Sequence, residues 1–372
     1  MCVIMVRKYV KRLLLKRIVR CNERSIWASF YHEIYSKCRI KKMSPLQFKQ
    51  IQDYYKKNWG KRINYHEYYY SMTGIFSEKY IPDTLYFDFI DPCLNNHRMV
   101  AAYVDKNGYR RLFPEVRQPD LILSNIDGYY YHEGVVITEQ KAIEICSELS
   151  DAIIKPSLDS CQGKNVARFK SKRGLTNLDG LTVQQLLKKY DRNFLVQKTI
   201  HQHPVMESLN PSSVNTVRVL TLRRENEIIC LSVIVRIGRE GAVVDNGHAG
   251  GYCCGVDESG QLKENGFICA TGECRQKTDQ GTVLKNVTVP YFNHIVETAK
   301  NLHFKLPYLN LVGWDFCVDD KNEIVLIEFN TNSALDIMQL CNGPVFGDYT
   351  EEILRKISGS HFNIQINRFL ER

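Results

Sequence analysis

The chain has 372 residues, of which 44% are hydrophobic and 24% are charged. This is enough for two or three lobes with true cores, and it excludes a single small domain. The thirteen cysteines include no CxxC pair, which argues against a disulfide framework or a zinc site and predicts reduced thiols in the cytoplasm. No segment approaches the roughly 18 uncharged apolar residues of a membrane span.

The formal net charge of +9 belongs to the N-terminus. Residues 1–62 hold seventeen Lys and Arg against three acidic residues, a net charge of +14, so the remainder of the chain carries −5. In residues 1–20, apolar side chains recur at helical spacing opposite basic ones, and the charges leave no signal-peptide h-region. This pattern predicts either a helix on the anionic inner face of a membrane or a solvated helix docked on the protein body. A nucleic-acid role is disfavoured, because the segment holds no recognised binding motif.

The predicted elements fall into three consecutive blocks. Residues 1–95 are predicted to form a helical N-terminal lobe. Residues 96–210 combine short strands with two helices, and residues 211–372 hold longer strands and a closing helix. The predicted strands are 99–104, 134–138, 151–157, 193–200, 215–224, 227–237 and a hairpin over 312–330, and the predicted helices are 139–149, 181–191 and 349–357. Segregated strands and helices, without strict alternation, favour an α+β fold.

The hairpin carries the most informative polar residues. If Val318 lies opposite Glu323, then Asp315 lies opposite Leu326, and Leu326, Glu328 and Asn330 point the same way as Asp315. Two carboxylates held so close need a cation, a proton or bulk water. Three oxygen ligands with room for phosphate oxygens suit Mg²⁺. The alternative is an amphipathic hairpin whose acidic side chains face solvent.

Lys155 ends an apolar strand and precedes a loop that contains Ser160, Gly163 and Lys164. Backbone N–H groups and an ammonium in such a loop complement phosphate oxygens. The segment is not a P-loop, because Leu158 and Asn165 stand where that motif needs Gly and Ser or Thr. An ordinary strand-end lysine is the alternative.

Arg218 lies within an otherwise apolar strand. A buried arginine needs a partner, and a phosphate suits its planar fork. An ion pair with Asp315 or Glu328 is the alternative, and both partners are compatible with one site. Four glycines then surround His248 in the segment 245–257, which predicts a loop whose backbone approaches something closely, or else a plain hairpin loop.

Residues 193–204 read as a strand that leaves one lobe and bends toward another. Free backbone groups at such a bend would contact an adenine edge. His201 and His203 lack a third ligand, so loop polarity explains them better than a metal does.

In this order, the motifs resemble those of ATP-grasp enzymes. The motifs are VDK (104–106), IIKPS (153–157), LVQKTIHQHP (195–204), SVNTVRVLTL (213–222), DNGHAGG (245–251) and VGWDF with IEFNTNS (312–333). They are most similar to the group associated with sugar transfer and polysaccharide assembly, with teichuronopeptide-type ATP-grasp proteins as relatives. The resemblance implies a nucleotide clamped between two α+β lobes, 96–210 and 211–372, beside the helical N-terminal lobe.

The resemblance also implies roles for particular residues. Lys106 and Lys155 would contact the phosphates, beneath the loop Ser160, Gly163 and Lys164. The hinge Gln197, Lys198 and Thr199 would contact adenine, although many relatives have Glu where Gln197 stands and no ribose-contacting acid is obvious afterwards. Arg218 would lie near the transferred phosphoryl group, with Asn246 and His248 in the loop that meets the substrate carboxylate. The metal ligands would be Asp315, Glu328 and Asn330.

The function implied is an ATP- and Mg²⁺-dependent carboxylate–amine ligase that forms an acyl phosphate. Its small-molecule substrates would be a carboxylate, such as a uronic or amino acid of a surface polysaccharide, and an amine. A kinase that phosphorylates a hydroxyl is one alternative. A nucleotide-binding scaffold in a membrane-associated assembly is another, and the intact metal trio and Arg218 argue against it.

Overall fold

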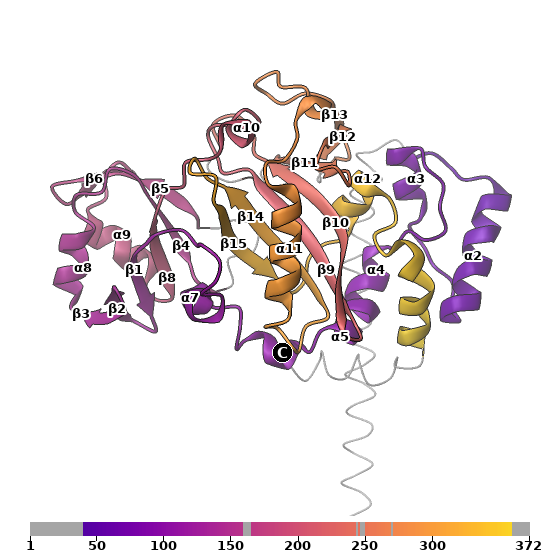
Figure 1. Cartoon of the computed structure of the whole chain (residues 1–372), viewed down its shortest axis with the longest axis horizontal. Helices are drawn as coiled ribbons and strands as arrows, with labels where there is room; N and C mark the ends of the chain where they lie inside the picture. Colours follow the sequence, from indigo (N-terminus) through magenta and orange to yellow (C-terminus); the bar gives the residue numbers. More distant parts are fainter. Residues whose placement is uncertain (1–39, 159–164, 243–244, 246–249, 269–270, 359–372) are drawn as a thin grey trace, which may run out of the picture.

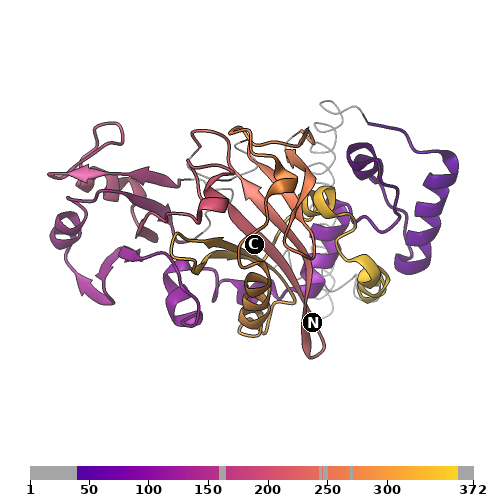
Figure 2. The same cartoon turned by 45° about the horizontal axis from the view of Figure 1, so that its top comes forward.

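The computed structural model describes residues 40–158, 165–242, 245, 250–268 and 271–358. These residues form a small sheet, a large sheet and a group of helices, arranged in that order along the longest axis of the molecule (Figure 1). The three groups follow the chain order only in part, because the C-terminal helices return to pack against the N-terminal ones (Figure 2). The α+β fold predicted from the sequence is confirmed.

The small sheet has six strands in the order β3-β2-β1-β8-β4-β5. Its apolar side chains pack on helices α8 and α9 in one core. Because side chains alternate across a strand, Ile154 and Val196 enter this core, while Lys155 and Gln197 lie on the opposite face. The bounds are β1 (Leu121–Ile126), β2 (Tyr129–His132), β3 (Val135–Ile137), β4 (Ala152–Pro156), β5 (Ala167–Phe169), β8 (Phe194–Lys198), α8 (Glu139–Ile145) and α9 (Val183–Tyr190).

The large sheet has seven strands in the order β13-β12-β11-β10-β9-β14-β15, and helix α11 covers one of its faces. Val217, Val219 and Trp314 contribute to the core on that face. The bounds are β9 (Thr216–Arg224), β10 (Glu227–Ile237), β11 (Tyr252–Val256), β12 (Leu262–Ile268), β13 (Cys274–Arg275), β14 (Leu311–Val318), β15 (Ile324–Asn330) and α11 (Phe292–His303).

The N-terminal helices cover part of the other face of the large sheet. Together with α12 (Asp336–Asn342) and a helix over 350–358, they enclose Leu220, Leu222 and Ile234 in a second core. Helix α2 begins with a capping box between Ser44 and Gln47. The N-terminal bounds are α2 (Pro45–Trp59), α3 (Glu67–Thr73), α4 (Asp83–Leu85), η1 (Tyr86–Ile90) and α5 (Asp91–Leu94).

The connection from these helices to the small sheet corrects one prediction. Residues 99–104 were predicted to form a strand, but helix α6 (His97–Val100) and a turn occupy this region. The apolar side chains of Val100 and Tyr103 pack against the core of the large sheet, so their burial does not depend on a strand. The segment continues through η2 (Lys106–Gly108) and α7 (Tyr109–Leu112).

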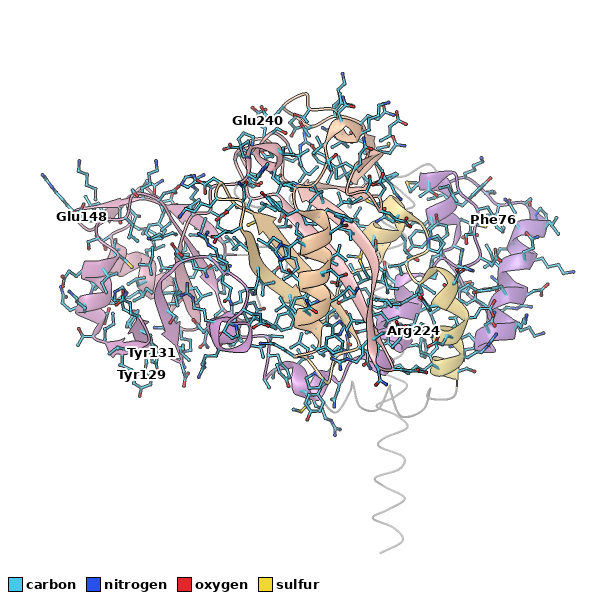
Figure 3. The ribbon with its side chains drawn as sticks, viewed as in Figure 1. Phe76, Tyr129, Tyr131, Glu148, Arg224 and Glu240 are labelled. Atoms are coloured by element: carbon cyan, nitrogen blue, oxygen red, sulfur yellow. The ribbon has the colours of Figure 1, made fainter. Side chains whose placement is uncertain are left out.

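The remaining predicted strands and helices occur close to their expected places. The hairpin of β6 (Ser171–Lys172) and β7 (Leu175–Thr176) extends from the small lobe, and α10 (Pro204–Glu207) follows β8. Two short 3₁₀ turns, η5 (Leu284–Asn286) and η6 (Gly347–Tyr349), complete the described elements. Figure 3 shows Tyr129 and Tyr131 at the lower edge of the small lobe, and Phe76, which follows α3, at the other end of the molecule.

The register of the β14–β15 hairpin differs from the prediction. Phe316 pairs with Leu326, and a bulge then shifts the ladder so that Asp315 lies directly opposite Glu328. The bulge turns Leu326 into the core with Phe316, whereas Ile327 and Glu328 both line the space between the sheets. A strict alternation rule cannot anticipate the extra residue, because a bulge inserts one position into a single strand.

Candidate functional site

Neighbouring strands of the large sheet place charged side chains in a row. Asp315 on β14 pairs in register with Arg218 on β9 and with Glu328 on β15. The guanidinium of Arg218 donates two hydrogen bonds to the Asp315 carboxylate, from Nε to Oδ1 at 2.7 Å and from Nη2 to Oδ2 at 2.5 Å. Arg236 on β10 donates to Asp315 Oδ2 at 3.1 Å, and Asn330 Nδ2 does so at 3.2 Å. The ion pair considered from the sequence is therefore present.

The network continues to Asp245, which comes before residues 246–249 of the glycine-rich loop, outside the described residues. Asp245 lies 3.4 Å from Arg236 and accepts a hydrogen bond from the hydroxyl of Thr216. Burial raises the pKa of Asp245, although Arg236 opposes this effect. Burial would lower the pKa of Arg236, but Asp245 and Asp315 outweigh it and raise that pKa. Two arginines thus share two buried carboxylates.

The contacts of the Asp315 carboxylate affect how it could bind a metal. Burial alone would raise its pKa, but Arg218, Arg236 and Asn330 outweigh burial and hold the pKa below its ordinary value. Three N–H donors crowd Oδ2 of this carboxylate, whereas Oδ1 accepts from one donor only. Glu328 is less engaged, with 27% of its side chain exposed and Lys106 Nζ at 3.5 Å. A metal at Oδ2 would have to displace at least one of these donors, whereas Oδ1 keeps one acceptor position.

The donor set nevertheless fits a magnesium ion. Two carboxylates and a carboxamide provide hard oxygen ligands on one face, and Mg²⁺ commonly binds one or two carboxylates together with phosphates. Only two members of the trio are acidic, and accordingly no cluster of three His, Cys, Asp or Glu side chains suited to a metal occurs among the described residues.

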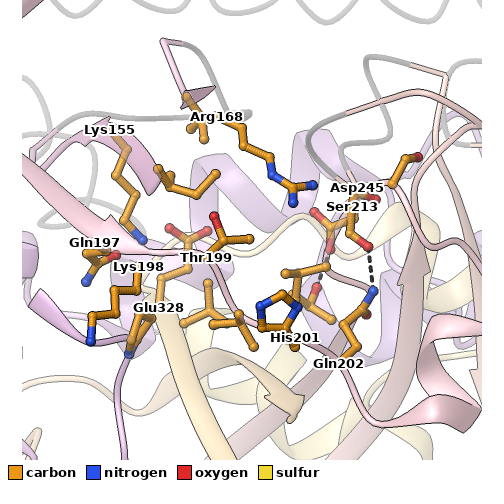
Figure 4. Close-up of a pocket in the computed structure, with 18 of the residues that line it drawn as sticks. Lys155, Arg168, Gln197, Lys198, Thr199, His201, Gln202, Ser213, Asp245 and Glu328 are labelled. Carbon is orange, nitrogen blue, oxygen red and sulfur yellow. Dashed lines mark hydrogen bonds between the residues drawn. The ribbon is translucent and has the colours of Figure 1, made fainter. Parts of the chain in front are cut away.

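Two lysines approach from the side of the small sheet. Lys155 at the end of β4 is half-buried, and burial, with Lys106 nearby, lowers its pKa to about 8, although Glu328 opposes the shift. Lys106 belongs to η2, whose place is set by a hydrogen bond from its backbone N–H to the carbonyl of Ser157, at 3.1 Å. Lys155 and Glu328 extend from facing sheets into the same space (Figure 4).

A cleft between the two sheets holds these groups. One wall comes from the small lobe and the hinge after it, with Ile153, Val166, Arg168, Gln197, Lys198 and Thr199. The other comes from the large lobe, with Val214, Thr216, Arg236, Asp245, Ile327 and Glu328. Apolar side chains and cations in one cleft suit a ligand with both a flat aromatic group and an anionic part.

The cleft also contains residues that sequence reasoning missed. Arg236 stands in the apolar run VIVRI as Arg218 stands in TVRVL, so the same pattern would have identified it. Arg168 alternates with the core residues Ala167 and Phe169 and extends into the cleft (Figure 4). Glu207 at the end of α10 lines the cleft near the hinge, and a single exposed glutamate gives no sequence signal.

Part of the predicted site lies outside the described residues. This applies to Ser160, Gly163 and Lys164 above the phosphates, and to Asn246 and His248 in the glycine-rich loop. The described members of the predicted set are Lys106, Lys155, Gln197, Lys198, Thr199, Arg218, Asp315, Glu328 and Asn330. All of these lie at the cleft or its acidic row, but the Lys198 side chain is 67% exposed and its ammonium lies 3.7 Å from Asp120.

Comparison with solved structures finds ATP-grasp ligases. The ligase PsnB, solved with a precursor variant, Mg and ADP, is 10% identical, with a TM-score of 0.40 over 71% of this chain and 61% of that one. An L-amino acid ligase from Bacillus licheniformis is 12% identical, with a TM-score of 0.41 over 72% and 52%. D-cycloserine synthetase DcsG is 13% identical, with a TM-score of 0.41 over 72% and 73%. This chain thus spans about half to two thirds of the first two structures. No curated protein matches it.

Two facing antiparallel lobes, with lysines on the smaller and an arginine–carboxylate row on the larger, form the ATP-grasp fold. A family model described as sugar-transfer associated ATP-grasp matches residues 95–355. The chain belongs to this family, and the resemblance seen in the sequence is confirmed.

Proposed function

We propose that the protein is an ATP- and Mg²⁺-dependent carboxylate–amine ligase. The main support is the convergence of cations and carboxylates from two lobes on one cleft. The site has six cations against four carboxylates, namely Lys106, Lys155, Arg168, Lys198, Arg218 and Arg236 against Glu207, Asp245, Asp315 and Glu328. A net positive cleft attracts a polyphosphate, and the apolar lining residues Ile153, Val166 and Ile327 suit its base.

In this proposal, each lobe holds one part of the reaction. Lys106 and Lys155 bind the β- and γ-phosphates from the small-lobe side, and the hinge residues Gln197, Lys198 and Thr199 contact adenine. Asp315, Glu328 and Asn330 would hold Mg²⁺, which would neutralise phosphate charge when bound. Arg218 and Arg236 turn from Asp315 toward the γ-phosphate, since phosphate oxygens match the guanidinium fork as well as carboxylate does.

The chemistry then proceeds in two displacements. An oxygen of the substrate carboxylate attacks the γ-phosphorus, the bond to the β-bridging oxygen breaks, and ADP leaves. The amine nitrogen attacks the carbonyl carbon of the acyl phosphate, the C–O bond to phosphate breaks, and the nitrogen loses a proton. Arg218 offsets the charge on the transferred phosphoryl group. The loop with Asn246 and His248 is proposed to hold the carboxylate.

The family's association with sugar transfer suggests the substrate class. We propose that the carboxylate is a uronic acid or amino acid unit destined for a surface polysaccharide. The test is a screen of such acids for ADP release, with and without amine acceptors. Phosphate released only with both substrates, together with an amide product, supports the ligase. A stable phosphorylated hydroxyl compound would instead identify a kinase.

We also propose that the protein is cytoplasmic and contacts the anionic inner face of the membrane. Residues 1–20, which carry the basic stripe, lie outside the described residues. Among the described residues, no helix is long and apolar enough to cross a bilayer. Helix α2, the outermost element at one end of the molecule, adds the exposed lysines Lys49, Lys56 and Lys57 against Asp53 (Figure 1). Basic residues near an anionic surface attract it additively.

A further inference from the structure

Asn95 occupies the junction between the N-terminal helices and the large sheet. It follows α5 and is 3% exposed. Its side-chain oxygen accepts hydrogen bonds from the backbone N–H groups of Asn310 at 2.9 Å and Leu311 at 3.0 Å. Its side-chain nitrogen lies within donating distance of Thr331 O at 2.8 Å, Leu311 O at 3.0 Å and Asp91 Oδ1 at 3.1 Å.

These contacts bridge β14 and the chain after β15, beyond the point where the two strands pair with each other. Gly313 and Asn330 form the last pair of the β14–β15 ladder. Leu311 lies just before that pair and Thr331 just after it, so the Asn95 amide joins the strands where their own hydrogen bonds end. The carbonyl of Thr331 is one residue beyond Asn330, so this hydrogen bond holds the backbone next to Asn330.

Asn95 is itself held in place from the side of the N-terminal helices. Asp91, which is 1% exposed, accepts from Asn95 through Oδ1 and lies 2.8 Å from His97 Nε2 through Oδ2. A buried amide with both ends engaged has little freedom to turn, because each lost hydrogen bond would leave a desolvated polar group. The bridge between Leu311 and Thr331 is therefore rigid.

We infer that Asn95 is a positioning residue for the metal site, and that it holds Asn330 in place beside Asp315. The inference rests on the proposed function, because it assumes that Asn330 is a ligand. The inference gives the N-terminal lobe a role in the site, although this lobe lies outside both nucleotide-binding lobes. Asn95, the last residue of the N-terminal lobe, joins the two strands of the β14–β15 hairpin beyond their last pair. Groups that orient metal ligands typically change metal affinity by roughly 10–100-fold when they are removed.

The test is calorimetric binding of ADP to the full chain over a range of Mg²⁺ concentrations, and again in EDTA. In Asn95→Ala, we expect the Mg²⁺ concentration for half-maximal effect to rise roughly tenfold or more, with the ADP affinity in EDTA unchanged. Asn95→Ser keeps a small polar side chain, and its hydroxyl is too short to keep the donation to Thr331, so it should show the same defect. This second variant decides the question if the alanine variant does not fold.

Asn310→Ala is the matched control. Its side chain also crosses this junction, donating to Leu94 O at 2.7 Å, but does not reach Thr331. It should lower thermal stability without changing the Mg²⁺ requirement. If the Asn95 variants shift the Mg²⁺ requirement no more than Asn310→Ala does, Asn95 is only a structural link and the inference is overturned. If the wild-type protein binds ADP without any Mg²⁺ dependence, the proposed Mg²⁺-dependent function is wrong, and the inference about Asn95 is then wrong as well.

Discussion

Arg218 and Asp315 lie opposite each other on β9 and β14 and join their side chains through two hydrogen bonds of 2.7 and 2.5 Å. The pair is 14% and 1% exposed at its side chains, so neither charge is well solvated. Removal of one partner from a buried pair of this kind strongly destabilises the protein, because the other charge is left unpaired. It also keeps a guanidinium fork in place close to where the γ-phosphate is proposed to bind.

Arg218→Lys should therefore affect turnover more than nucleotide binding. Lysine keeps the charge but loses the planar fork, so one of the two hydrogen bonds to Asp315 and the bidentate contact to phosphate are lost. We expect turnover to fall on the order of a hundredfold, with ADP affinity changed by much less. Steady-state kinetics and calorimetry measure the two effects. Equal losses in both would mean that Arg218 serves nucleotide binding or folding.

Lys155→Met should weaken nucleotide binding and stabilise the unliganded protein. Burial lowers the pKa of Lys155 to about 8, below its unfolded value of about 10.4. The charged form therefore costs stability at every pH below 8, and the cost disappears as pH rises toward the unfolded pKa. We expect the variant to gain about 3 kcal/mol at pH 7 and much less at pH 10, as measured by denaturant unfolding.

The same pKa predicts proton uptake when the nucleotide binds. At pH 8 about half of the Lys155 side chains are neutral, and phosphate favours the ammonium form. Calorimetry of ADP binding in buffers of different ionisation enthalpy should report uptake of a fraction of a proton, and affinity should fall as pH rises above 8. Both effects should be absent from Lys155→Met. Persistence of the proton uptake in that variant would assign it to another group.

Glu328→Gln should raise the Mg²⁺ requirement of turnover. The substitution removes one of the two carboxylates proposed to hold the metal and keeps the side-chain shape, at a cost of several kcal/mol of charge stabilisation. Glu323→Gln is the control, because Glu323 belongs to the same hairpin but is 55% exposed and pairs with Arg117 away from the cleft. Full turnover of Glu328→Gln at low Mg²⁺ would place the metal elsewhere.

Glu207 is expected to bind the ribose. It lines the cleft beside the hinge, and a carboxylate there can accept hydrogen bonds from both ribose hydroxyls. Wild-type protein should prefer ATP to 2′-deoxy-ATP by roughly tenfold, the contribution of one hydrogen bond to a charged group. Glu207→Ala should lose this preference, and Glu240→Ala, outside the cleft lining, should keep it. A preference that survives Glu207→Ala would point to another ribose contact.

Anionic vesicles should bind the full chain at low salt, and neutral vesicles should not. Reversing the charge of the exposed residues Lys49 and Lys56 on α2 should weaken this binding roughly tenfold or more, because each basic residue near the surface contributes about 1 kcal/mol. Reversing Lys188 and Lys189 on α9, at the opposite end of the molecule, changes the net charge equally and serves as the control (Figure 1). Equal behaviour of the two double variants in sedimentation would exclude α2 as a membrane contact.

The sequence alone was sufficient for the family, the α+β class and most elements of the two sheets. The strands around Lys155 and Arg218 are dense in β-branched and apolar residues, so a single polar residue in each stood out against its neighbours. The same reasoning would have identified Arg236. These signals are local, because side-chain periodicity depends only on the backbone geometry of one strand.

Tertiary structure decided which polar groups meet. The bulge at Ile327, which brings Glu328 opposite Asp315, depends on how β15 pairs with β14 and leaves no mark in the alternation of its own residues. The sharing of Asp315 by Arg218 and Arg236 depends on the order of three strands. Asn95 reaches Thr331 from 236 residues away. Hydrogen bonds and ion pairs act over a few ångströms in space, so contacts between residues distant in the chain appear only once the sheets have formed.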